Sequence, residues 1–205
     1  PAVRESIEAV LEAARLKKEG VCRALVVTGC FPQRYGRVLV RRLPEVDLFL
    51  GTESFLGLAG HLRRLLGGRR TPKMILESEA NLWQKAHLRH LFSSPGTAYL
   101  KIADGCRRPC AFCAIPLIKG TAVSRPMPVI LDEARALRDM GVREIILIAQ
   151  DTTDYGRDLG LKDGLAQLLE GLVAAIPDVD WLRIMYAYPG YVSDRLIEVM
   201  ASHAQ

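Results

Sequence analysis

Residues 143–149 read Arg-Glu-Ile-Ile-Leu-Ile-Ala, and this apolar run is the clearest β-strand signal in the chain. Its neighbours in sequence are predicted as a strand at 98–103, a helix at 128–140, a helix at 165–176, a strand at 181–186 and a helix at 193–200. These segments make three strand-then-helix units in a row. Such alternation predicts an α/β fold with a parallel sheet, of the kind found in a (β/α) barrel or an open sheet. Three units are too few to close a barrel, so we expect part of a longer protein.

The first part of the chain shows the same alternation in shorter segments. The predicted elements are a helix from Ile7 up to Gly20, a strand at 23–28, a helix at 35–42, a strand at 46–51 and a helix at 54–66. Breaks follow at Gly67–Pro72 and again at Ser93–Gly96. We therefore expect one domain at 1–78, a linker at 79–95 and a second domain at 96–205.

Composition is that of a globular protein, because 49% of the 205 residues are hydrophobic and 25% are charged. Residues 1–95 hold 16 Lys and Arg against 9 Asp and Glu, whereas residues 96–205 hold 12 against 14. This asymmetry indicates two modules, the first of which faces either solvent or an acidic partner such as nucleic acid. The apolar runs are too short for a membrane span. Five cysteines, three of them within eight residues, favour a reducing cytoplasm over a disulfide framework.

The cysteines form the strongest functional motif. Residues 104–113 read Asp-Gly-Cys-Arg-Arg-Pro-Cys-Ala-Phe-Cys, which places Cys106, Cys110 and Cys113 in a C-x3-C-x2-C pattern directly after a predicted strand. Thiolates are soft ligands for zinc or iron–sulfur centres, and structural zinc normally takes four ligands. Three thiolates on a four-iron cluster would leave one iron open. A zinc site completed from elsewhere in the chain remains the alternative on spacing alone.

This pattern, with Phe112 before the last cysteine, resembles the radical S-adenosylmethionine superfamily. The flanking sequence resembles its methylthiotransferases, and most closely the group that modifies an aspartate of a ribosomal protein. The stretches that carry this likeness are 99–106 (Tyr-Leu-Lys-Ile-Ala-Asp-Gly-Cys), 124–126 (Ser-Arg-Pro), 148–156 (Ile-Ala-Gln-Asp-Thr-Thr-Asp-Tyr-Gly), 186–189 (Tyr-Ala-Tyr-Pro), 28–36 (Thr-Gly-Cys-Phe-Pro-Gln-Arg-Tyr-Gly) and 43–47 (Leu-Pro-Glu-Val-Asp).

The resemblance implies an incomplete flavodoxin-like N-terminal domain followed by the first half of a radical S-adenosylmethionine partial barrel. It implies that Cys106, Cys110 and Cys113 hold a 4Fe-4S cluster that binds S-adenosylmethionine. Cys30 matches one of three N-terminal cysteines that hold a second, auxiliary 4Fe-4S cluster, and the other two positions would precede Pro1. Cys22 matches neither set, and we interpret it as a buried structural thiol.

The implied reaction adds a methylthio group to the β-carbon of an aspartate in small-subunit ribosomal protein twelve. A radical must break that C–H bond, because no side-chain acid or base can ionise it near neutral pH. The implied partners are the ribosomal protein and an electron donor such as flavodoxin or ferredoxin, whereas a contact with ribosomal RNA is suggested by charge. For RNA, the basic residues Arg63, Arg64, Arg69, Arg70 and Lys73 are candidates, and a solvated charged face is the alternative.

Other candidate site residues follow the predicted strands. Gln150 and Asp151 end the strand at 143–149, and by resemblance Asp151 would contact the methionyl amine; capping the next turn is the alternative. Phe112 is expected to line the adenine site or to pack on the cluster loop. Tyr186 and Tyr188 would face the cavity or fill the barrel.

Arg125 is expected either to bind a carboxylate through both of its terminal nitrogens or to pair with a surface acid. The alternative functions are a tRNA adenosine methylthiotransferase and a non-catalytic zinc or iron–sulfur module. The Asp-Thr-Thr segment at 151–153 favours the ribosomal-protein enzyme over the tRNA enzyme.

Overall fold

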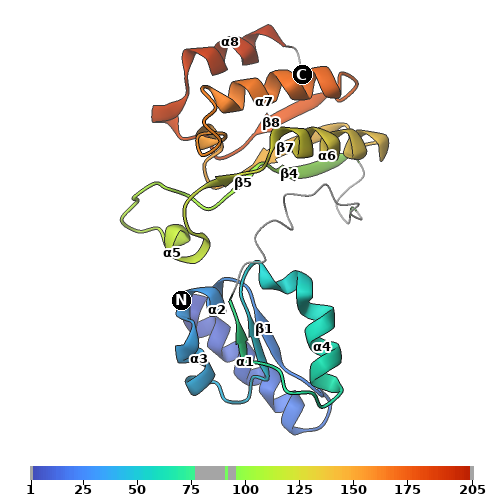
Figure 1. Ribbon diagram of the computed structural model, residues 1–205, viewed down its shortest axis with the longest axis vertical. Coiled ribbons are helices and arrows are strands. Elements are labelled where there is room, and N and C mark those ends of the chain that lie inside the picture. The colour runs from blue at the N-terminus through green and yellow to red at the C-terminus, as the bar shows by residue number, and fades with distance from the viewer. Residues whose placement is uncertain (1, 77–90, 92–95, 204–205) are drawn as a thin grey trace. The chain divides into compact units, whose positions relative to one another are not determined.

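A computed structural model describes residues 2–76, 91 and 96–203 of the chain. The chain divides into two compact units, residues 1–82 and 83–205, and each unit is described by itself (Figure 1). The predicted linker at 79–95 lies outside the described residues except for Leu91, so the predicted domain limits stay a prediction.

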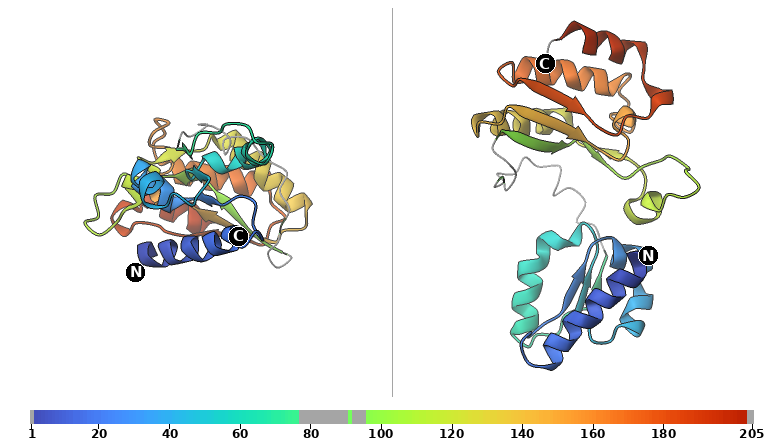
Figure 2. Two further views of the ribbon diagram at one scale, coloured as in Figure 1. Left: turned by 90° about the horizontal axis from the view of Figure 1, so that it is seen from below. Right: turned by 180° about the vertical axis from the view of Figure 1, so that it is seen from behind.

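The first unit contains a three-stranded parallel sheet in the order β1-β2-β3. Its elements are α1 (Ala2–Lys18), β1 (Val26–Thr28), α2 (Cys30–Tyr35), α3 (Arg37–Arg42), β2 (Leu48–Leu50), the 3-10 helix η1 (Ser54–Gly57), α4 (Leu58–Leu66) and β3 (Met74–Ile75). The central strand β2 is buried at all three of its residues, as a strand covered on both faces requires. Helices α1 and α4 lie on opposite sides of this sheet (Figures 1 and 2).

The second unit is built on a parallel sheet in the order β4-β7-β8. Its elements are β4 (Thr97–Lys101), β5 (Ala103–Asp104), α5 (Ile115–Lys119), β6 (Val123–Ser124), α6 (Met127–Asp139), β7 (Glu144–Ile148), the 3-10 helix η3 (Thr152–Asp154), α7 (Gly164–Ala175), β8 (Trp181–Ile184), the 3-10 helix η4 (Pro189–Tyr191) and α8 (Asp194–Ser202). Strands β5 and β6 form a separate antiparallel pair, in which Ala103 lies opposite Ser124.

Helix packing explains which residues form the core of the second unit. Helix α6 packs on α7 and α7 packs on α8, and all three contribute buried side chains to one core with the strands. On α6 the apolar residues Ile130, Ala134 and Leu137 recur at helical spacing, so one face of the helix is buried. Among the described residues, none of the helices combines the length and the apolar character that crossing a bilayer requires.

The parallel α/β prediction is confirmed in both units, but some local predictions are wrong. The helix predicted at 35–42 is interrupted at Gly36, where φ is +55°, and becomes α2 and α3. The strand predicted at 23–28 begins only at Val26. The strand predicted at 98–103 ends at Lys101, and its last residue belongs to the β5–β6 pair. The two-residue strands and α5 were not predicted, because such short segments carry no periodic signal.

Candidate functional site

The three-cysteine motif lies in the loop between β5 and α5, beyond the carboxyl end of β4. Cys106 is buried, while Cys110 and Cys113 are half-buried. Two backbone hydrogen bonds shape the loop: the Cys106 N–H donates to Gly120 O at 3.1 Å, and the Cys113 N–H donates to Cys110 O at 3.0 Å. All five cysteines are free thiols. The motif therefore presents three thiols on a single loop at the edge of the sheet where α/β proteins place their chemistry.

The entry to this loop is fixed by Gly105 and Asp104. Gly105 has φ of +74°, and a Cβ there would lie 2.2 Å from Thr121 O, so the position requires glycine. Asp104 Oδ2 accepts from the ammonium groups of Lys101 at 2.6 Å and Lys119 at 2.9 Å. Burial alone would raise the pKa of Asp104, but these two lysines outweigh it and lower that pKa below its ordinary value.

Two arginines between the first two cysteines attach the loop to the segment after β7. Arg107 Nε lies 2.6 Å from Asp154 Oδ2, and Arg107 Nη2 donates to Ala122 O at 3.0 Å. Arg108 Nε donates to Asp151 Oδ2 at 2.5 Å, with only 9% and 4% of the two side chains exposed. Burial opposes the charge of Arg108, but the hydrogen bond and the charge of Asp151 raise its pKa above the ordinary value.

Arg108 also contacts the loop after β8. Its guanidinium carbon lies 3.5 Å from the ring centroid of Tyr191 and 5.0 Å from that of Tyr188, which is cation–π geometry. Tyr188, Tyr191, Arg108 and Cys110 line one cavity of about 420 Å³. The loops that follow three strands of the fold therefore meet at one arginine beside the cysteines.

The loops after β7 and β8 are joined directly as well. Thr152 donates from its N–H to Tyr186 O at 3.2 Å and from its hydroxyl to Met185 O at 3.0 Å. Tyr186 has φ of +62°, a conformation that a tyrosine adopts only when its surroundings hold it there. The arrangement at these strand ends is therefore fixed by backbone contacts in addition to the ion pairs.

The predicted site residues differ in their surroundings. Phe112 is 94% exposed on the cysteine loop, and Gln150 is exposed directly after β7. Asp151 caps the next turn, since its Oδ1 accepts from the Thr153 N–H at 3.0 Å, so the capping interpretation is observed. The roles predicted for Phe112, Gln150 and Asp151 toward the cofactor stay predictions.

Cys30 begins α2 in the first unit and is exposed. Cys22 is half-buried rather than buried, with its thiol donating to Ala24 O at 3.0 Å. Arg125 does not pair with a surface acid, and it meets a carboxylate through one terminal nitrogen rather than both. It forms a buried ion pair with Glu133 at 2.6 Å and donates to Lys101 O at 2.7 Å.

The donor set of the cysteine loop is three thiols, the kind of ligand that iron–sulfur clusters take. Within the described residues, no three His, Cys, Asp or Glu side chains are grouped to hold one metal ion. In a four-iron cluster each thiolate binds a different iron, so the sulfur atoms need not converge on one point. The Arg108 N–H also donates to Cys106 Sγ at 3.4 Å, and hydrogen bonds to the sulfurs are one of the features that tune such clusters.

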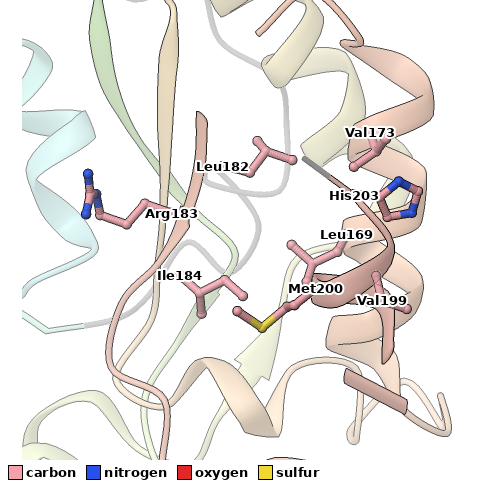
Figure 3. A pocket seen from close by; sticks show the side chains of 8 residues that line it. All are labelled: Leu169, Val173, Leu182, Arg183, Ile184, Val199, Met200 and His203. Carbon is pink, nitrogen blue, oxygen red and sulfur yellow. The ribbon is translucent and has the colours of Figure 1, made fainter. Parts of the chain in front are cut away.

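A second cavity, of about 300 Å³, lies between β8 and helices α7 and α8 (Figure 3). Its lining residues are Leu169, Val173, Leu182, Arg183, Ile184, Val199, Met200 and His203. Figure 3 shows Arg183 pointing away from the apolar side chains, which gather between the strand and the helices. Because this lining contains neither thiol nor carboxylate, the cavity offers no ligand set comparable to that of the cysteine loop.

Comparison with known proteins assigns the class. The profile described as Radical SAM superfamily matches residues 100–204, which is about half of the chain and contains the cysteine loop. The chain therefore belongs to the radical SAM superfamily.

Within that superfamily, the chain is similar to proteins named ribosomal protein uS12 methylthiotransferase RimO. It is 49% identical to that of Syntrophus aciditrophicus over 98% of this chain and 45% of the relative. It is 45% identical to that of Symbiobacterium thermophilum over 98% of this chain and 41% of the relative. The chain thus spans less than half the length of the curated relatives it matches.

The fold also resembles a solved structure of the radical S-adenosylmethionine methyltransferase TsrM from Kitasatospora setae with tryptophan and a SAM analog bound. The TM-score is 0.65 and the sequence identity 16%, covering 98% of this chain and 43% of that one. A second TsrM structure, with cobalamin and a [4Fe-4S] cluster bound, gives a TM-score of 0.64 at 16% identity. At this identity the likeness concerns the fold alone.

Sequence reasoning missed the side chains that hold the cysteine loop, namely Arg107, Arg108, Asp154 and Tyr191. The available signal was the pair of adjacent arginines inside the cysteine spacing, together with three aspartates at positions 151, 154 and 158. Opposite charges in two loops that follow neighbouring strands are candidates for pairing.

Proposed function

We propose that this chain is part of a radical S-adenosylmethionine methylthiotransferase that modifies an aspartate of ribosomal protein uS12. The observation that carries the proposal is the 49% identity to a uS12 methylthiotransferase over 98% of the chain. The three free thiols on the loop beyond β4 support it, because they provide the ligands that a four-iron cluster needs. Five free thiols are also compatible with a reducing cytoplasm.

In this proposal Cys106, Cys110 and Cys113 hold the cluster and leave one iron open for S-adenosylmethionine. When bound, the cluster supplies an electron that cleaves S-adenosylmethionine. Phe112 is exposed beside the thiols and Gln150 is exposed at the end of β7, so both side chains are accessible to that cofactor. Asp151 is engaged by Arg108 and Thr153, and a contact with the methionyl amine would share or replace those bonds.

Cys30 is proposed as a ligand of the auxiliary 4Fe-4S cluster. Its thiol is exposed at the first residue of α2, directly after Gly29, whose φ of +103° turns the backbone there. Cys22 offers a natural comparison, because it is half-buried and its thiol is already bonded to a backbone oxygen. We expect the two cysteines of this unit to differ in function.

The partners are part of the same proposal. Arg63, Arg64, Arg69, Arg70 and Lys73 are all exposed, which fits contact with ribosomal RNA as well as a solvated face. A flavodoxin or ferredoxin would supply the electron. The names of the relatives compared above favour uS12 over tRNA as the substrate.

The test uses the full-length protein, reconstituted with iron and sulfide without oxygen and supplied with S-adenosylmethionine and a reductant. It receives uS12 and tRNA side by side, and mass spectrometry of both is expected to find a methylthio group on uS12 alone. Modification of tRNA instead would support the alternative enzyme. One bound zinc without acid-labile sulfide would contradict both and support a non-catalytic module.

Variants separate the proposed roles of the cysteines. Cys106→Ala, Cys110→Ala and Cys113→Ala are each expected to abolish reductive cleavage of S-adenosylmethionine. Cys30→Ala is expected to spare that cleavage and to block methylthiolation. Cys22→Ala serves as the matched control and should retain both activities. Retained deoxyadenosine formation in any of the first three variants would contradict the ligand assignment.

A further inference from the structure

Arg108 occupies an unusual position for a charged residue, because it is buried within the cysteine motif itself. Only 9% of its side chain is exposed, and its charge is balanced by Asp151 at 2.5 Å. One of its terminal nitrogens, Nη2, is buried without a hydrogen-bond partner. Burying an arginine costs free energy even when it is paired, so a role in the loop must compensate for that cost.

The structure links this side chain to a thiol through a short series of contacts. The Asp151 carboxylate holds the Arg108 guanidinium, and the Arg108 backbone N–H donates to Cys106 Sγ at 3.4 Å. The rings of Tyr188 and Tyr191 cover the guanidinium on the side of the loop after β8. The orientation of one sulfur is therefore tied to residues that follow β7 and β8.

Charge near a cluster has a direct electronic effect. Reduction adds a negative charge, so a nearby cation favours the reduced cluster and raises its potential, whereas an anion lowers it. Arg108 and Asp151 form a buried pair, and both charges act through a medium that screens them poorly. Cys110 lines the same cavity as Arg108.

We infer that Arg108 and Asp151 are positioning residues that hold the cysteine loop and set the reduction potential of the cluster bound by Cys106, Cys110 and Cys113. The inference rests on the proposed function, since it requires that cluster. It predicts opposite effects of two neutral replacements. Arg108→Gln removes a cation and lowers the midpoint potential, while Asp151→Asn removes an anion and raises it.

The experiment measures the midpoint potential by a redox titration followed by electron paramagnetic resonance. It uses the full-length protein in a Cys30→Ala background, so that the signal comes from the cluster of the cysteine loop, and iron and sulfide are assayed first. The double variant Arg108→Gln with Asp151→Asn should return the potential toward that of the parent. Arg108→Lys, which keeps the charge, should stay closer to the parent than Arg108→Gln.

The matched control is Arg143→Gln, which removes one arginine charge at the opposite end of β7. Arg143 pairs with Asp180 where 62% and 53% of the two side chains are exposed, so its removal should leave the potential unchanged. If Arg108→Gln loses iron, Asp151→Asn must still raise the potential for the inference to stand.

The possible results separate a failure of the proposed function from a failure of the inference on Arg108 and Asp151. A parent protein that binds no iron and sulfide would overturn the proposed function and this inference together. A cluster that forms, with a potential that stays constant or moves in the same direction in both single variants, would overturn the inference alone. A shift that appears equally in Arg143→Gln would do the same, because it would reflect net charge rather than this buried pair.

Discussion

The buried ion pair between Arg125 and Glu133 allows a quantitative test of what stabilises the second unit. Glu133 lies on the apolar face of α6, and Arg125 lies just before that helix, with 9% and 4% of the two side chains exposed. Arg125 Nη2 lies 2.6 Å from Glu133 Oε2, and Arg125 Nη1 donates to Lys101 O at 2.7 Å. Glu133→Gln keeps the size of the side chain and removes the charge that balances Arg125.

Removing one partner of a buried pair costs about 3–5 kcal/mol, because the remaining charge is left uncompensated away from water. Glutamine retains an oxygen that accepts a hydrogen bond, so we expect a loss near the lower limit, about 3 kcal/mol. The exposed pair of Arg143 and Asp180 has the same N–O distance of 2.6 Å, but 62% and 53% of its side chains are exposed. Asp180→Asn should therefore cost only about 0–1 kcal/mol.

Urea unfolding of the 205-residue chain, followed by circular dichroism, measures both losses. With a slope of about 1.5 kcal/mol per molar urea, Glu133→Gln should lower the midpoint of the transition to which the second unit contributes by about 2 M. Replacing both partners, Arg125→Met with Glu133→Leu, should cost about 2 kcal/mol less than the sum of the two single losses. A Glu133→Gln loss no larger than that of Asp180→Asn would refute the reasoning from burial.

Two further predictions concern Gly105 and Tyr155. Gly105→Ala should destabilise the second unit by about 2 kcal/mol or more, because the new Cβ would meet Thr121 O at 2.2 Å in a backbone conformation with φ of +74°. An unchanged melting temperature would contradict this prediction. Burial raises the pKa of Tyr155 to about 12, and its hydroxyl donates to Arg125 O at 2.9 Å. Since its pKa in the unfolded chain is about 10, the wild-type chain loses up to about 3 kcal/mol of stability as pH rises from about 10 to 12. At pH 8 the free energy of unfolding of the wild-type chain should exceed that of Tyr155→Phe by about 1 kcal/mol. Urea titrations at several pH values should show this difference vanish near pH 11; a difference that is constant with pH would contradict the assignment.

The parallel sheets could be predicted because their strands are continuous apolar runs between amphipathic helices. Leu48, Phe49 and Leu50 are fully buried, and a short continuous apolar run of this kind is typical of a parallel strand that is covered on both faces. Strands β3, β5 and β6 are two residues long, so they are too short for any pattern to repeat within them. Their positions are decided by pairing with distant segments, which local sequence does not encode.

The structural role of Arg125 was encoded in the helical periodicity of α6. Glu133 falls within the spacing of Ile130, Ala134 and Leu137, so the helical pattern itself places a carboxylate on the buried face of α6. A buried carboxylate requires a cation or several donors, and Arg125 is two residues before the helix begins. The sequence therefore contained a signal for a structural role of Arg125, whereas the prediction was a carboxylate bound through both terminal nitrogens or a surface acid.

The candidate site shows a different limit of sequence reasoning. Cysteine spacing limits how far apart the three thiols can lie, but it does not determine the shape of the loop that carries them. Regular secondary structure does not shape this loop between β5 and α5, so its conformation depends on Gly105 and on the side chains of Arg107 and Arg108. Because their partners lie in loops after other strands, we expect a change at Asp151 or Tyr191 to alter the loop that carries the thiols without contacting them. Residues between the cysteines are therefore as informative about this site as the cysteines themselves.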